Sequence, residues 1–363
     1  MGIKNLSKLI KKHAPNGIKT RDFKYYTGHR IAVDASMCIY QFLISVRSEG
    51  ANLTWGDSTT SHLNGLFYRT IRWIESGITP VFVFDGEAPA AKIHELSKRE
   101  KRREEASEKL KEALEEKDSE KILKYKKMNM KMDKTHIEDA QILLDLLKIP
   151  YITAPSEAEA FCAWMCKEGF VDGVATEDMD TLCFGAPCLL RNFNSSKSKK
   201  MQIDEFNLNA ILKELDFKQE QFIDLCILLG CDYSSTLKGI GQKKAYDLIE
   251  KYKSIEGIFE ANPELEKENE GFAYKMARSI FMELSSTKMN SEVMEDKENK
   301  KNVEKLNNIV FRADDINLDD AVTYLVDEKG FDKTRITNGV TKLKSGRSFM
   351  KQTKIDAFFK RVN

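Results

Sequence analysis

Three short apolar runs, each followed by acidic residues, constrain the fold of this chain most strongly. The runs cover residues 30–34, 81–86 and 173–176, and their β-branched and aromatic content is typical of strands buried on both faces. Helical patterns fill the sequence between them. Because strands that alternate with helices form sheets covered on both sides, the sequence predicts an α/β fold whose central, mostly parallel sheet is flanked by helices.

The acidic residues at the ends of these strands predict a shared site. In an open α/β sheet, ligands bind just outside the carboxyl ends of the strands. Asp34, Asp85 and the pair Asp178 and Asp180 would converge there if the three strands are neighbours. One aspartate after a strand is ordinary turn chemistry. Acidic residues after all three strands are harder to explain in that way.

Three more acidic residues join this candidate set. Glu157 and Glu159 open a predicted helix for which Ser156 is a plausible N-cap, and either glutamate could serve only the helix dipole. Residues two apart do not share a face of a regular helix, so both would reach one site only from a frayed first turn. Asp232 follows the amphipathic stretch 219–230.

Seven carboxylates can be gathered only with counter-ions, since like charges packed together repel one another. All-oxygen ligation favours Mg²⁺ or Mn²⁺ over zinc. Two such ions about 4 Å apart can hydrolyse a phosphodiester by in-line displacement. The sequence therefore predicts a site for two Mg²⁺ ions, with Mn²⁺ as a substitute.

A charge-dense stretch at residues 92–134 has 15 basic and 11 acidic residues and neither Gly nor Pro. Mixed charges of this kind are also typical of a solvated surface helix. However, six basic residues cluster in its first turns, which favours a surface that faces phosphates. Lys92 and Arg99 lie two helical turns apart, so both could meet a scissile phosphate from one face.

Six segments, in the same order along the chain, resemble the motifs of eukaryotic-type flap endonucleases. These enzymes belong to the XPG branch of the 5′ nuclease superfamily. The six segments are residues 1–6, 33–36, 83–86, 154–160, 176–180 and 229–233, and the resemblance covers essentially the whole chain. It implies a PIN-like 5′ nuclease core with a helical arch or cap and a helix-two-turn-helix region that binds DNA. The implied regions are an N-terminal nuclease region (1–91), a helical gateway and cap (92–134), an internal nuclease region (135–230), the helix-two-turn-helix with further helices (231–335) and a tail with a clamp-binding motif (336–363).

The resemblance also implies roles for individual residues. It assigns the first metal to Asp34, Asp85, Glu157 and Glu159, and the second to Asp178, Asp180 and Asp232. Lys92 and Arg99 would be the catalytic, positively charged residues of the gateway helix that meet the scissile phosphate. The implied DNA-binding residues are Tyr40, Arg47, Lys92, Arg99, Arg102, Arg103, Glu157, Gly230, Asp232, Gly239, Gly241, Lys243 and Lys244. The turn at residues 236–241 would hold a K⁺ ion against duplex phosphates.

The implied activity is Mg²⁺-dependent hydrolysis of branched DNA with a 5′ flap, together with 5′→3′ exonuclease activity, in Okazaki fragment maturation and long-patch base excision repair. Gln352, Ile355, Phe358 and Phe359 fit the motif that binds the trimeric sliding clamp PCNA, although the two phenylalanines could instead dock onto their own domain. The expected protein is a monomer in the nucleus, with the nucleolus and mitochondrion as further compartments. The alternatives are a related nuclease that prefers nicks, bubbles or four-way junctions, and a non-catalytic DNA-binding or clamp scaffold.

The overall charge, +1 from 58 basic and 57 acidic residues, is unusual for a protein that binds DNA. If seven acids line one metal site, the other surfaces carry a net charge of +8. A net charge near zero therefore does not exclude DNA binding. No apolar run approaches the ~18 residues of a membrane span, and seven cysteines without a CxxC pair predict reduced, intracellular thiols. Residues 285–308 predict a flexible insertion.

Overall fold

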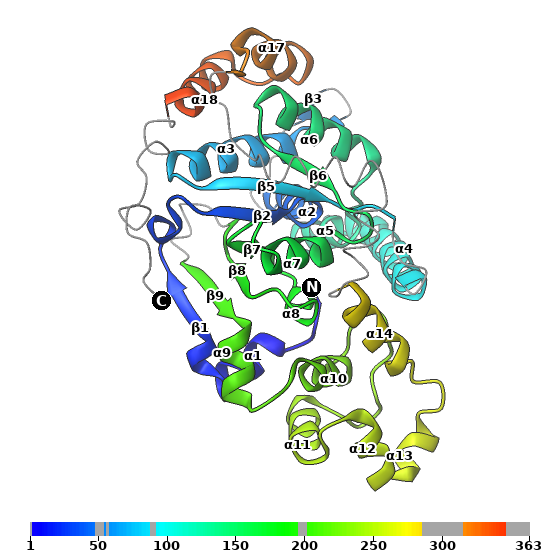
Figure 1. The fold of residues 1–363 in the computed structure, drawn as a ribbon. Helices are drawn as coiled ribbons and strands as arrows, with labels where there is room; N and C mark the ends of the chain where they lie inside the picture. The colour runs from blue at the N-terminus through cyan, green and yellow to red at the C-terminus, as the bar shows by residue number, and fades with distance from the viewer. Residues whose placement is uncertain are drawn as a thin grey trace, which may run out of the picture. The chain divides into compact units, whose positions relative to one another are not determined.

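The computed structural model describes residues 2–47, 54–55, 58–87, 92–194, 202–284 and 315–345 (Figure 1). The predicted insertion at 285–308 and the four predicted clamp-binding residues lie outside these ranges. The chain divides into two compact units. The first contains residues 1–21, 85–95 and 153–307, and the second contains residues 22–84, 96–152 and 308–363.

A mixed sheet of seven strands, flanked by helices, confirms the predicted α/β fold class. The first unit contributes four strands in the order β1 (Ile18–Arg21), β9 (Ile203–Asn207), β8 (Cys188–Arg191) and β7 (Gly173–Ala175). Only the β7–β8 pair is parallel there, because β9 pairs with both β8 and β1 in antiparallel register. This antiparallel edge is half solvated, and it lacks the continuous apolar runs of the parallel strands.

The second unit contributes β2 (Arg30–Asp34), β5 (Thr79–Phe84) and β6 (Tyr151–Thr153). β2 and β5 are parallel, with Asp34 opposite Val83 in the register. Every residue of β5 is buried, as its unbroken apolar sequence predicts. A short hairpin, β3 (Thr54–Trp55) and β4 (Ser58–Thr59), forms a separate sheet.

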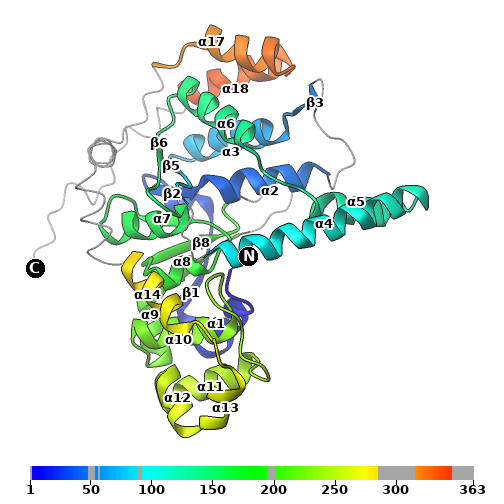
Figure 2. The ribbon, with the colours of Figure 1, turned by 90° about the vertical axis from the view of Figure 1, so that its right-hand side faces the viewer.

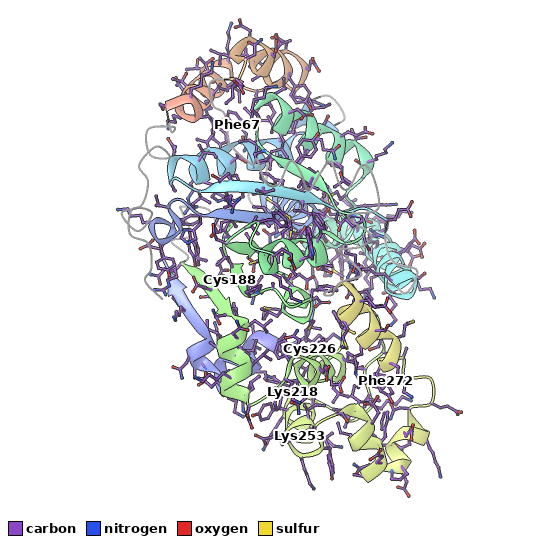
Figure 3. The ribbon with its side chains drawn as sticks, viewed as in Figure 1. Phe67, Cys188, Lys218, Cys226, Lys253 and Phe272 are labelled. Atoms are coloured by element: carbon purple, nitrogen blue, oxygen red, sulfur yellow. The ribbon has the colours of Figure 1, made fainter. Side chains whose placement is uncertain are left out.

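Helices complete the second unit and include the predicted gateway and cap. They are α2 (Ala35–Arg47), α3 (Ser61–Glu75), α5 (Ser119–Met128), α6 (Lys134–Leu146), α17 (Leu318–Val322), the π-helix η6 (Thr323–Glu328) and α18 (Lys333–Ser345). The long helix α4 (Ile93–Glu115) begins in the first unit and leads into α5, so the charge-dense stretch is helical as predicted (Figure 2). α18 packs closely on α3, since a Cβ on Gly339 would lie 2.6 Å from the ring of Phe67, which Figure 3 labels.

The helices of the first unit are α1 (Leu6–His13), α7 (Ala158–Lys167), α8 (Asp180–Cys183), α9 (Leu208–Leu215), α10 (Gln219–Leu229), α11 (Gln242–Tyr252), α12 (Ile255–Ala261), α13 (Pro263–Glu268) and α14 (Tyr274–Leu284). Arg278 of α14 ties three of them together. Its guanidinium donates to Asp224 of α10 at 2.6 and 2.7 Å and to Glu256 of α12 at 2.8 Å through two nitrogens. Bidentate pairs of this kind hold helices in a defined orientation.

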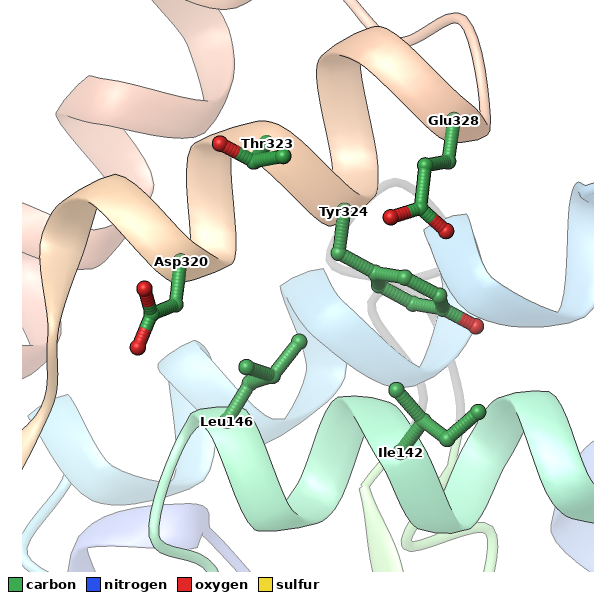
Figure 4. Close-up of a pocket in the computed structure, with 6 residues that line it drawn as sticks. All are labelled: Ile142, Leu146, Asp320, Thr323, Tyr324 and Glu328. Atoms are coloured by element: carbon green, nitrogen blue, oxygen red, sulfur yellow. The ribbon is translucent and has the colours of Figure 1, made fainter.

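The structure describes all seven cysteines, and each is a free thiol. Within the described ranges, no helix is both long and apolar enough to cross a bilayer. A pocket of about 400 Å³ lies between α6 and the C-terminal helices of the second unit. Figure 4 shows the six residues that line it, Ile142, Leu146, Asp320, Thr323, Tyr324 and Glu328, none of which belongs to the predicted site.

A buried histidine makes the stability of the second unit sensitive to acid. His62 on α3 is 1% exposed, and neither ring nitrogen has a hydrogen-bond partner among the described residues. Burial and the neighbouring His136 lower the pKa of His62 to about 4, although Asp139 and Asp133 oppose the shift and Lys329 adds to it. In the unfolded chain, His62 has a pKa near 6.5, so between pH 6.5 and pH 4 it is protonated in the unfolded chain but mostly neutral in the folded protein.

Stability is therefore full above pH 6.5 and should decline as the pH falls toward 4, by roughly 3 kcal/mol at most from this group. His62→Phe keeps a ring beside His136 and removes the titration, so its stability should fall less steeply with acid. Thermal unfolding midpoints of both proteins between pH 7 and pH 4.5 test this. Parallel curves would show that another group causes the acid sensitivity.

Candidate active site

Six of the seven predicted metal ligands belong to the first unit, and the seventh belongs to the second. Asp34 ends β2 and is 5% exposed. Its carboxylate accepts the Met37 backbone N–H at 2.9 Å, in the first turn of α2. The six of the first unit are Asp85, Glu157, Glu159, Asp178, Asp180 and Asp232.

The start of α7 explains how Glu157 and Glu159 reach one site. Glu157 is the N-cap residue, with an extended backbone (φ −79°, ψ 134°), whereas Glu159 lies in the first helical turn. Regular helical spacing does not apply to this pair, because one member lies outside the helix. Both carboxylates contact the ammonium of Lys92, which lies 3.6 Å from Glu159 Oε1. Glu157 and Glu159 can therefore reach one site although they are only two residues apart.

The predicted N-cap at Ser156 is wrong, because the helix begins one residue later and a different side chain caps it. The backbone N–H of Ala158 donates to Asp85 Oδ1 at 2.9 Å. Asp85 is close enough because the Gly86 N–H donates to the Ser156 carbonyl at 2.7 Å. A Cβ on Gly86 would collide with the Ala154 carbonyl. Glycine thus permits the contact that places Asp85 beside Glu157.

Asp178 lies between β7 and α8 and is 5% exposed, and Asp180 is the first residue of α8 and is 1% exposed. The Asp180 N–H donates to Asp178 Oδ1 at 3.0 Å, and the Ile3 N–H donates to Asp180 Oδ1 at 2.8 Å. Gly2 has a φ of +74° and leaves no space for a Cβ beside the two carboxylates. The N-terminal segment therefore orients this acidic pair.

Lys92 supplies positive charge at the centre of the acidic residues. Its ammonium contacts Glu157 and lies 3.6 Å from Glu159 and 3.8 Å from Asp232. Burial favours the neutral amine, but Glu159, Glu157 and Asp232 outweigh it and raise the pKa of Lys92. The ammonium stands in for the charge that a cation would bring to these oxygens.

Among the described residues, no three acidic side chains are arranged to hold a metal ion as the chain stands, but the type of donor fits hard divalent cations. Burial raises the pKa of Asp180 well above its usual range, and the neighbouring carboxylates Asp178 and Glu159 raise it further. The donors are carboxylate oxygens, the ligands preferred by Mg²⁺ and Mn²⁺. Oxygens of this type are supplied by Glu157, Glu159 and Asp232, which share the Lys92 ammonium, by the neighbouring pair Asp178 and Asp180, and by Asp85, whose Oδ1 caps α7.

Sequence reasoning assigned no role to Tyr233, which follows Asp232 directly. Its hydroxyl donates to Glu157 Oε2, and its ring is 3% exposed. The Lys92 ammonium lies 5.9 Å from the centre of that ring. In the sequence, only the place of Tyr233 in the segment 229–233 pointed to a role at the site, because a neutral hydroxyl donor does not stand out among charged residues.

The structure places the other predicted residues on helices and turns. Tyr40 is half-buried on α2, while Arg99 and Arg103 are half-buried and Arg102 is exposed on α4. Arg47 ends α2, and its side chain lies outside the described part. Their DNA-binding roles stay predictions.

The predicted helix-two-turn-helix lies at the α10–α11 turn. Gly230 and Gly239 have φ values of +104° and +74°, which glycine adopts readily, and Gly241 is the N-cap of α11. Lys243 and Lys244 are exposed in the first turn of α11. Free backbone N–H groups and two lysines at a helix start suit a phosphate.

Comparison with known proteins places this fold and site in a class. The XPG N-terminal domain family matches residues 1–106, and the XPG I-region family matches residues 148–232. The structure of flap endonuclease-1 from Methanococcus jannaschii is 31% identical, with a TM-score of 0.65 over 91% of this chain and 96% of that chain. The catalytic core of Rad2 in complex with a DNA substrate is 26% identical, with a TM-score of 0.63 over 92% of this chain and 98% of that chain. Fold and site together define a 5′ nuclease of the XPG type.

The sequence relatives narrow this class further. Flap endonuclease 1 of Enterocytozoon bieneusi (strain H348) is 54% identical over 361 residues, which cover 99% of each chain. The chain belongs to the flap endonuclease 1 family of nucleases.

Proposed function

We propose that the protein is a Mg²⁺-dependent, structure-specific endonuclease that cuts DNA at the base of a 5′ flap and also degrades 5′ ends as an exonuclease. The buried carboxylates around Lys92 carry this proposal, because a fold alone needs no such concentration of like charge. Two Mg²⁺ ions, or Mn²⁺ in their place, would neutralise this negative charge. When bound, they would activate water and stabilise the attacking and leaving oxygens.

The residues of the chain would share the remaining work. Glu157, Glu159, Asp178, Asp180 and Asp232 would hold the ions, together with Asp85 and Asp34. Lys92 would transfer its ammonium from the carboxylates to the scissile phosphate and stabilise the charge that develops there. Arg99, on the helix α4 that follows Lys92, would add a second positive charge at the same phosphate. Both side chains are cationic throughout, so neither has to gain a proton during the reaction.

DNA would be held by backbone contacts that do not read its sequence. The exposed Lys243 and Lys244 and the turn at 236–241 would bind duplex phosphates, with a K⁺ ion at the turn. Arg102 and Arg103 of α4 would attract the single-stranded flap, and Tyr40 would stack on a base. The Rad2 core, whose fold this chain shares, was solved with a DNA substrate. That precedent supports a DNA-binding role for this chain.

A fluorescent 5′-flap duplex incubated with the protein and Mg²⁺ tests this activity. We expect one incision near the single-strand to double-strand junction, which leaves a ligatable nick and which EDTA abolishes. Absence of EDTA-sensitive incision would overturn the proposal. Faster incision of nicked, bubble or four-way-junction substrates than of the flap would favour a related nuclease. Binding without cleavage would favour a scaffold.

The cellular role that follows is maturation of Okazaki fragments and long-patch base excision repair by a monomer in the nucleus, with the nucleolus and mitochondrion as further compartments. In this proposal, the sliding clamp PCNA would recruit the protein to the 5′ flaps of these pathways. Gln352, Ile355, Phe358 and Phe359 would bind one subunit of the trimeric clamp.

Replacing Phe358 and Phe359 by alanine should abolish stimulation by the clamp and leave incision without the clamp unchanged, because the substitutions remove only the aromatic anchor. Incision rates of both proteins with and without the clamp measure this. Equal losses in both conditions would favour docking of the tail onto its own domain.

A further inference from the structure

Tyr233 contacts both charged groups at the centre of the site and carries no charge itself. Its hydroxyl donates to Glu157 Oε2, while the Lys92 ammonium contacts the other oxygen of the same carboxylate, Oε1. Glu157 is therefore held from both sides. Of these two contacts, only that of Lys92 would be released if Lys92 moved to a phosphate.

The ring of Tyr233 is fixed independently of the hydroxyl. It meets Phe281 of α14 edge to face, with ring centres 5.1 Å apart, and Phe281 in turn contacts Phe184. α14 is itself held to α10 by the bidentate pair of Arg278 and Asp224. Packing alone therefore positions the ring, so the hydroxyl can be removed without disturbing it.

The hydroxyl is an obligatory donor. An ionised carboxylate can only accept hydrogen bonds, so the phenol hydroxyl is the donor in its contact with Glu157 Oε2. Its partner Glu157 is 4% exposed and has little access to water. If the hydroxyl is absent, Oε2 has no equivalent donor in this contact, and the carboxylate can rotate.

We propose that Tyr233 is a positioning residue for the metal site, which orients Glu157 by its hydrogen bond to Oε2 and leaves Oε1 directed at the cation position now held by Lys92. This inference rests on the proposed function, because it assumes that Glu157 binds a divalent cation. Partners that orient a ligating carboxylate typically contribute 10-fold to 100-fold to metal affinity. Tyr233 acts through Glu157 and need not touch the substrate.

Binding of Mn²⁺ without DNA tests the inference directly. MnCl₂ is titrated into the full chain, and the electron paramagnetic resonance signal of free Mn²⁺ reports the bound fraction. Tyr233→Phe should weaken the tighter Mn²⁺ site roughly 10-fold or more, while the metal-free unfolding midpoint stays close to that of the parent protein. A merely structural role would lower the midpoint and leave the affinity unchanged.

Tyr246→Phe is the matched control. Tyr246 is also buried, and its hydroxyl also donates to a glutamate, Glu250 Oε1, at 3.1 Å, but that glutamate lies on α11 and is not a predicted ligand. Its Mn²⁺ affinity should equal that of the parent protein.

Two results would overturn the inference and can be told apart. If Tyr233→Phe binds Mn²⁺ within twofold of the parent protein, Tyr233 has no positioning role, and the metal site stands. If the parent protein binds no Mn²⁺, the metal site fails and the role of Tyr233 fails with it.

Discussion

Asp178→Ala should lower the rate of Mg²⁺-dependent flap incision by roughly three orders of magnitude. Asp178 is 5% exposed, and its carboxylate faces the Asp180 backbone N–H, so no other acidic residue can replace it from the same position. Single-turnover incision of a fluorescent 5′-flap duplex measures the loss. Affinity for the same duplex, measured in Ca²⁺ or EDTA, should change much less, because the DNA is held mainly by basic residues elsewhere.

Asp172→Ala provides the control, since Asp172 is an exposed aspartate of the same unit and is not a predicted ligand. It should cleave like the parent protein. The metal-free unfolding midpoint of Asp178→Ala should not fall sharply, because the substitution also relieves repulsion with Asp180. Unchanged cleavage would refute the metal assignment. Loss of folding together with DNA binding would show that the aspartate is structural.

Lys92→Met should lower incision roughly 100-fold. Methionine keeps the length and apolar stem of lysine but removes the charge that would stabilise the developing phosphate charge. The variant should also be less stable without metal, because Glu157, Glu159 and Asp232 lose their shared cation. Added Mg²⁺ should restore most of this stability but not the incision rate.

Lys111→Met on α4, the helix that follows Lys92, is the control, because Lys111 is exposed and is not among the predicted site residues. Its incision rate and metal-free midpoint should both match the parent protein. If Lys92→Met cleaved at the parent rate, Lys92 would be only a counter-ion for the carboxylates.

The strands and the acidic residues that follow them could be predicted because they are local features of the sequence. Each strand contains a continuous apolar run; Asp34 ends its strand, Asp85 follows directly, and Asp178 and Asp180 lie in the turn and first helical residue after β7. The antiparallel edge strands β9 and β1 could not be predicted in this way, since their sequences show no such run. Pairing of these strands depends on tertiary contacts that the sequence does not display locally.

The individual contacts of the site could not be predicted from the sequence for a similar reason. The hydrogen bond between Tyr233 and Glu157 joins residues 76 apart, and the contact of Lys92 with Glu157 joins residues 65 apart. The capping of α7 by Asp85 spans 73 residues. Sequence supplies the residue types for each contact, whereas packing decides which pairs meet.

Crystals soaked in MnCl₂ provide the most direct measurement of the central claim, which is that the carboxylates hold two divalent cations. We expect two anomalous peaks about 4 Å apart, bonded to oxygens of Glu157, Glu159, Asp178, Asp180 or Asp232, with the Lys92 ammonium displaced from Glu157. An anomalous map without peaks among these carboxylates, with Lys92 still in contact with Glu157, would contradict the account.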